Sequence, residues 1–83
     1  MEKYQEISKI TNFLDENKLN YEVDDGFGII KIKVKKRNWT LIYREWYDTW
    51  KVVITNSDTN EFIDTYNQYL DIILSDIKKE IES

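Results

Sequence analysis

Apolar side chains recur every three or four residues along the first part of the chain, as they do on the buried face of a helix. They are Tyr4, Ile7, Ile10 and then Phe13 or Leu14. This spacing predicts a helix over residues 2–17. Asn17 and Asn20 stand near its end, and asparagine tolerates the left-handed backbone with which many helices finish.

The middle of the chain alternates between apolar and polar residues, which is typical of strands with one buried face. We predict four strands, at residues 19–24, 28–36, 39–46 and 49–55. The pair Asp25-Gly26 fits a two-residue hairpin turn, and such a turn places Tyr21 opposite Ile30. The expected inward face consists of Leu19, Tyr21, Val23, Ile30, Ile32, Val34, Trp39, Leu41, Tyr43, Trp50, Val52 and Ile54.

Two further turns complete the register of this antiparallel meander. The first sets Val34 opposite Leu41, and the second sets Tyr43 opposite Val52. A slip of one residue would move each strand's apolar set to the other face, so the shared apolar face supports this pairing.

The last segment carries a wide apolar stripe at helical spacing. The stripe comprises Phe62, Ile63, Tyr66, Tyr69, Leu70, Ile73, Leu74, Ile77 and Ile81. Asp58 followed by Glu61 is similar to a capping box, which predicts that one long helix begins there. We therefore predict a single α+β domain over residues 1–83, with an N-terminal helix, a four-stranded antiparallel meander and a long C-terminal helix, both helices packed on one sheet face.

The same final stripe includes heptad spacing, with Ile63, Leu70 and Ile77 seven residues apart and Tyr66 and Ile73 between them. This spacing suits a coiled-coil seam, so a homodimer joined through the C-terminal helix is one expectation. Acidic residues on one side of this helix allow two further interpretations: a plain solvated helix face, or a mimic of nucleic acid that occupies a partner's phosphate site. The residues concerned are Glu61, Asp64, Gln68 and Asp71.

Composition excludes several kinds of chemistry. The chain has no Cys and no His, so thiolate and imidazole groups are absent as nucleophiles, bases or metal ligands. No phosphate loop, nucleophile elbow or metal spacing occurs, and we expect no enzyme activity, no metal and no cofactor. No long apolar run or leader occurs, so we expect a cytoplasmic protein without membrane contact. Glu45 is expected to face inward beside Trp50, paired with a lysine or an indole.

Charge is segregated along the chain, whose formal net charge is −4. Residues 27–51 carry seven basic residues against two acidic ones, whereas the segments on either side are acidic. The register places Arg44 between Lys31 and Lys51 on the outward face, where like charges repel one another. We expect the repulsion to be offset by long side chains that spread into water, by nearby acids or by a bound anionic partner. The partner-binding residues that we predict on this outward sheet face are Lys31, Lys33, Arg44, Trp46 and Lys51, with Ile42 and Val53 as the apolar centre.

In organisation the chain resembles the small acidic inhibitors that phages direct against bacterial defence systems, the anti-CRISPR class among them. The shared features are brevity, absence of cysteine, a helix-and-sheet domain, segregated charge and no catalytic constellation. The resemblance implies a non-enzymatic protein-binding domain, a phage-type inhibitor that blocks a larger, nucleic-acid-handling host or defence protein. Two alternatives stay open: a nucleic-acid-binding module that uses the basic sheet face, and a small homodimeric structural or regulatory protein. A plain solvated sheet face is the simplest account of the lysines.

Overall fold

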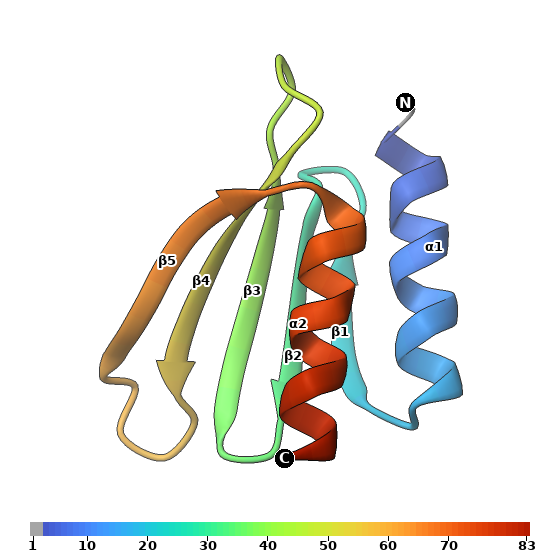
Figure 1. The fold of residues 1–83 in the computed structure, drawn as a ribbon. Coiled ribbons are helices and arrows are strands. Elements are labelled where there is room, and N and C mark those ends of the chain that lie inside the picture. Colours follow the sequence, from blue (N-terminus) through green and yellow to red (C-terminus); the bar gives the residue numbers. More distant parts are fainter. Residues whose placement is uncertain (1–2) are drawn as a thin grey trace.

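A computed structural model describes residues 3–83, which form two helices and a five-stranded antiparallel sheet (Figure 1). The elements are α1 (Lys3–Glu16), β1 (Asn20–Asp24), β2 (Ile29–Val34), β3 (Arg37–Tyr43), β4 (Trp50–Asn56), β5 (Phe62–Gln68) and α2 (Leu70–Glu82). Each strand pairs with the next one along the chain, so β1 and β5 are the sheet edges. The predicted α+β class is confirmed, and the predicted number of strands is wrong. The predicted helix start at residue 2 lies outside the described residues.

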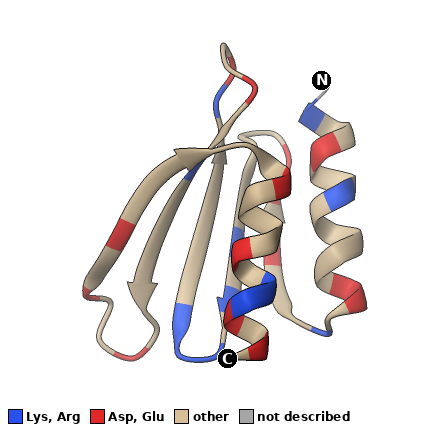
Figure 2. Ribbon diagram, in the orientation of Figure 1, with Lys and Arg blue, Asp and Glu red and all other residues tan. Residues whose placement is uncertain are grey.

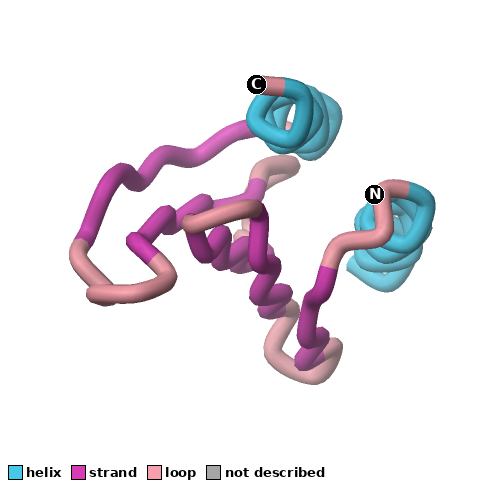
Figure 3. Tube along the Cα trace, turned by 90° about the horizontal axis from the view of Figure 1, so that it is seen from below, coloured by secondary structure: helices cyan, strands magenta, loops and turns pink. Residues whose placement is uncertain are grey.

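Both helices lie on one side of a bent sheet, as Figure 3 shows from below. Burial follows the expected periods, because α1 and α2 turn apolar residues toward the sheet and each central strand buries alternate ones. The core consists of Ile7, Ile10, Leu14, Ile30, Ile32, Val34, Trp39, Leu41, Trp50, Val52, Ile54, Leu70, Ile73 and Ile77. The inward faces predicted for β2, β3 and β4 are therefore confirmed.

Residues 62–68 form β5 and not the first half of a long helix. Phe62, Ile63, Thr65 and Tyr66 are aromatic or β-branched, and such side chains favour a strand over a helix. Pairing with β5 also satisfies the second edge of β4, which a four-stranded sheet would leave open. The C-terminal helix consequently begins only at Leu70.

This correction removes the basis of two expectations about the final segment. Ile63 and Tyr66 lie in β5, while Leu70 and Ile77 of α2 are buried in the core, so no heptad seam is left for a second copy. Asp64 also lies in β5, so the acidic rod predicted for this segment does not form.

The turns differ from the predicted ones. The β1–β2 connection is a loop of four residues, 25–28, and Tyr21 pairs with Ile32. The predicted partner was Ile30, two residues away. Val34 pairs with Arg37 in place of Leu41, a shift of four, across the two-residue turn Lys35-Lys36. Tyr43 pairs with Trp50 in place of Val52, again a shift of two. Even shifts keep every side chain on its face, which explains why the core is right although the pairs are not.

Candidate functional site

No described element covers the face of the sheet opposite the helices, which we call the open face. Cross-strand pairing places Lys31 between Glu22 on β1 and Thr40 on β3, and it places Lys51 beside Ile42. The predicted row of three cations is therefore wrong. Thr40 takes the position beside Lys31 that was predicted for Arg44, and the partner of Thr40 on β4 is Val53, not Lys51.

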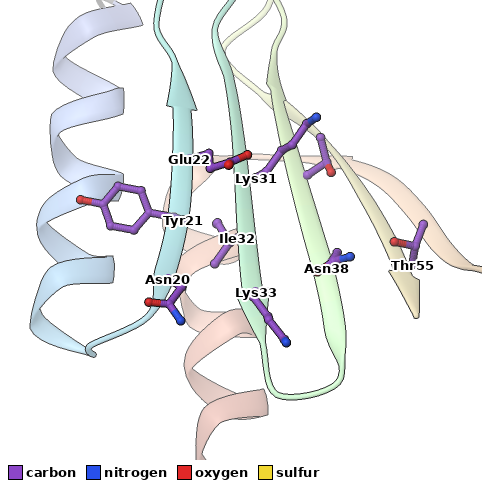
Figure 4. A pocket seen from close by; sticks show the side chains of 9 residues that line it. Asn20, Tyr21, Glu22, Lys31, Ile32, Lys33, Asn38 and Thr55 are labelled. Carbon is purple, nitrogen blue, oxygen red and sulfur yellow. The ribbon is translucent and has the colours of Figure 1, made fainter. Parts of the chain in front are cut away.

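A hollow of about 610 Å³ opens on this face (Figure 4). Its lining combines amide, hydroxyl, ammonium and carboxylate groups from β1 to β4. The lining residues are Asn20, Tyr21, Glu22, Lys31, Ile32, Lys33, Asn38, Thr40 and Thr55. Such a surface offers hydrogen bonds to a polar partner, and Lys31 and Lys33 add positive charge.

Five of the seven predicted binding residues lie on the open face, with the lysines exposed and the two aliphatic side chains half-buried. They are Lys31, Lys33, Ile42, Lys51 and Val53. The outward positions of β2, β3 and β4 include no aromatic residue. The open face therefore lacks, on these three strands, the stacking surface that single-stranded nucleic acids use.

The other two predicted residues, Arg44 and Trp46, lie on the β3–β4 loop, which projects from one end of the sheet (Figure 1). The structure thus corrects their placement on the sheet face, because β3 ends at Tyr43. The guanidinium of Arg44 lies 3.9 Å from the ring centroid of Tyr47 and donates to Thr49 Oγ1 at 3.0 Å. Trp46 is 91% exposed.

Trp46 belongs to a group of five exposed aromatic residues at this end of the molecule. They are Tyr4, Phe27, Trp46, Tyr47 and Tyr69, and we call them the aromatic end. Phe27 is 77% exposed, and the three tyrosines are all more than half exposed. Exposed large apolar side chains on neighbouring loops and element ends make this end a candidate interaction site.

Chain topology explains why these residues share one end. In an antiparallel meander the β1–β2 and β3–β4 loops lie at the same end, and α1 begins and β5 finishes there as well (Figure 1). Lys3 Nζ donates to the Gly26 carbonyl at 3.3 Å, which joins the start of α1 to the β1–β2 loop. The backbone N–H of Tyr43 donates to the Gly28 carbonyl at 2.8 Å, which joins that loop to β3.

Gly28 is the residue on which this junction depends. Its φ is +65°, and a Cβ added there would lie 2.8 Å from Tyr43 Cβ. Only glycine avoids both the left-handed strain and this clash. The predicted Asp25-Gly26 turn does not include this position. Phe27 was not predicted as a binding residue either, although an aromatic residue between two glycines in a turn has no strand or helix to bury it.

Beneath the aromatic end, a buried carboxylate supports the core. Glu6 Oε1 accepts a hydrogen bond from Trp50 Nε1 at 2.7 Å, and both residues are buried. The ring of Trp50 also meets that of Tyr43 edge to face at 5.2 Å. The expected pairing of a carboxylate with an indole therefore occurs, but with Glu6 from α1. Glu45, for which the pairing was predicted, is exposed on the loop.

Acidic residues occur in the projecting loop that carries Trp46, where the ribbon of Figure 2 is coloured red. Glu45 and Asp48 stand on either side of Trp46 and Tyr47, and no ion pair within residues 3–83 joins either carboxylate to a cation. Asp48 and Tyr69 also line a hollow of about 410 Å³ between the loop and the helices. Its remaining lining residues are Glu6, Lys9, Leu70 and Asp71.

Within residues 3–83, no group of three acidic, histidine or cysteine side chains could hold a metal ion. Burial, together with a hydrogen bond to Asp76 at 2.9 Å, raises the pKa of Tyr66 far above its usual value. Neither helix in the described part of the chain combines the length and apolar character needed to cross a membrane. Comparison with family models, with curated proteins and with solved structures finds no match to this chain.

Proposed function

We propose that this domain is a non-enzymatic protein-binding domain, an inhibitor of the phage type that occupies a surface on a larger, nucleic-acid-handling partner. The observation that carries the proposal is the aromatic end, above all Trp46 at 91% exposure on a projecting loop. Tryptophan and tyrosine are enriched among the residues that dominate binding energy at protein interfaces. The open face adjoins this end, and its exposed Lys51, the second residue of β4 after the projecting loop, would lie toward the rim of such an interface.

The energetic argument favours a protein partner. Full burial of one large apolar side chain contributes about 1.5–3 kcal/mol, and Trp46 is almost entirely available for such burial. The loop that carries it is held by Arg44 on the ring of Tyr47, so part of its ordering is completed before binding.

The test is affinity capture from bacterial lysate with three immobilised forms of the domain, followed by quantitative mass spectrometry. The forms are the unmodified chain, Trp46→Ala, and Phe62→Ala as a matched control. Phe62 is also an exposed aromatic residue, at 64%, but it begins β5 at the other end of the molecule. We expect a protein that the first and third forms retain and Trp46→Ala loses. Equal capture by all three forms would refute the assignment to the aromatic end.

A second candidate function, nucleic-acid binding, is favoured by the exposed Lys31 and Lys33 beside the 610 Å³ hollow. Fluorescence anisotropy with a single-stranded oligonucleotide at low salt tests it. This function requires affinity that falls steeply as salt rises, and further loss in Lys31→Glu/Lys33→Glu. Absence of binding at low salt removes this candidate and leaves the first one untouched.

A further inference from the structure

We infer that the aromatic end receives an arginine-rich segment of the partner protein. This inference rests on the proposed function and adds the partner's chemistry to it. Its supports are two contacts that the rings already make with cations of this chain, and the negative charge of the loops that carry the rings.

The first support is the use of ring faces at this end as cation sites. Arg44 lies 3.9 Å from the ring centroid of Tyr47, and Lys3 Nζ lies 5.1 Å from that of Tyr4. Both distances fall within the roughly 6 Å at which cations are attracted to aromatic rings. Indole is the best ring for this contact, and no cation of residues 3–83 lies over Trp46. At 91% exposure, both faces of its indole meet solvent.

The second support is charge. The β1–β2 and β3–β4 loops together contain one basic residue, Arg44, against three acidic ones, and Arg44 is already engaged with Tyr47. The acidic residues are Asp25, Glu45 and Asp48, and Asp24, the last residue of β1, directly precedes the first loop. Such a surface attracts cations and repels phosphates, so it selects against nucleic acid and in favour of a basic protein segment.

Arginine fits this surface better than lysine does. A guanidinium is planar, so it stacks on an indole face while its edge donates hydrogen bonds in pairs to a carboxylate. Glu45 precedes Trp46 directly and is exposed, which places both kinds of acceptor on one loop. An ammonium group makes the same charge contact but does not stack.

The test uses a fluorescein-labelled octa-arginine peptide and measures its binding by fluorescence anisotropy at physiological salt, with octa-lysine as the comparison. We expect octa-arginine to bind more tightly than octa-lysine. We also expect Trp46→Ala to weaken octa-arginine binding about three- to thirty-fold, whereas Phe62→Ala leaves it unchanged. No binding, or equal binding by Trp46→Ala, overturns the inference.

A polycation is also attracted to any acidic protein, and a matched pair of variants separates this effect. Glu45→Gln/Asp48→Asn and Asp58→Asn/Glu61→Gln remove the same number of charges, the first from the aromatic end and the second from the β4–β5 turn at the opposite end. We expect only the first pair to weaken binding, by about three-fold or more. Equal weakening by both pairs shows general attraction and overturns the inference.

The two proposals fail separately. A captured partner that depends on Trp46, together with no octa-arginine binding, sustains the protein-binding function and refutes the cationic segment. If octa-arginine binding depends on Trp46 but the lysate yields no Trp46-dependent partner, the cation-binding surface is sustained and the protein-binding function is refuted.

Discussion

The two buried tryptophans of the sheet allow a direct test of how the core is stabilised. Trp50 and Trp39 both lie on the inward face, and both are almost fully buried. Trp50 donates its indole N–H to Glu6 at 2.7 Å, whereas Trp39 Nε1 has no hydrogen-bond partner within the described residues. Replacement of each by phenylalanine removes one N–H and part of one ring, so the loss of ring volume is similar in the two variants.

The hydrogen bonds should then decide the difference between the variants. In Trp50→Phe, loss of a buried hydrogen bond to a charged group costs about 1.5–3 kcal/mol. In Trp39→Phe, removal of an unpaired buried donor returns the roughly 1–3 kcal/mol that its desolvation costs. We therefore expect Trp50→Phe to be less stable than Trp39→Phe by about 2.5–6 kcal/mol. A domain of this length has a total stability of about 4–12 kcal/mol, so the difference is easily resolved.

Urea unfolding followed by far-ultraviolet circular dichroism measures both free energies without reliance on tryptophan fluorescence. Glu6→Gln, which keeps an acceptor, should lose less stability than Glu6→Ala. In a double-mutant cycle, Glu6→Ala and Trp50→Phe should couple by about 1 kcal/mol or more. Equal stabilities for the two tryptophan variants, or no coupling to Glu6, would refute the reasoning.

Three further outcomes are expected. Gly28→Ala should destabilise the domain by about 2–4 kcal/mol in the same urea assay, because the new side chain combines left-handed backbone strain with a 2.8 Å clash. In Gly26→Ala the new Cβ meets only Asp24 Oδ1, at 3.6 Å, so the loss of stability should be less than about 1 kcal/mol. Burial and the hydrogen bond to Asp76 raise the pKa of Tyr66, so the folded state keeps a proton that the unfolded chain releases at pH ~10. The free energy of unfolding should therefore fall above that pH, and it should fall less steeply in Tyr66→Phe. Asp64 puts a charge on the edge strand β5 and accepts from the Thr65 N–H at 2.8 Å, so Asp64→Val should promote association seen by light scattering, while Asp58→Val in the adjoining turn should not.

How far the sequence predicts this fold depends on the kind of signal that each segment carries. Alternation over β2, β3 and β4 identifies their inward residues, since that assignment requires only the parity of each position. To predict which residues pair across two strands, the conformation of the turn must be known as well. The obvious two-residue turn, Asp25-Gly26, is wrong, because the chain reverses over four residues and this turn ends at Gly28. Lys35, at φ 55°, occupies a tight turn for which the sequence gives no glycine or asparagine signal.

The prediction for the final segment is wrong for a different reason. Apolar residues between Phe62 and Tyr69 satisfy helical spacing, and the apolar positions of α2 continue that spacing without a break. Periodicity alone therefore joins two elements into one, although the aromatic and β-branched content of the first half favours a strand. The same limit affects the site. Parity places Trp46 on a sheet face only if β3 continues past Tyr43, and the structure ends the strand there.

The basic residues of the stretch 31–37 fall into two groups that lie at different places in the structure. Lys31 and Lys33 lie on the open face, but Lys35 and Lys36 form the β2–β3 turn, at the end opposite the aromatic end. There Lys35 Nζ donates to the Ser83 carbonyl, and Arg37 lies 3.3 Å from Glu80. Lys35 and Arg37 thus bind the C-terminal end of α2 to the sheet, so their charges are not available for a partner. Since Arg37 is engaged in an ion pair within the chain and the side chain of Trp46 is 91% exposed, substitutions at Arg37 should act through stability and those at Trp46 through binding.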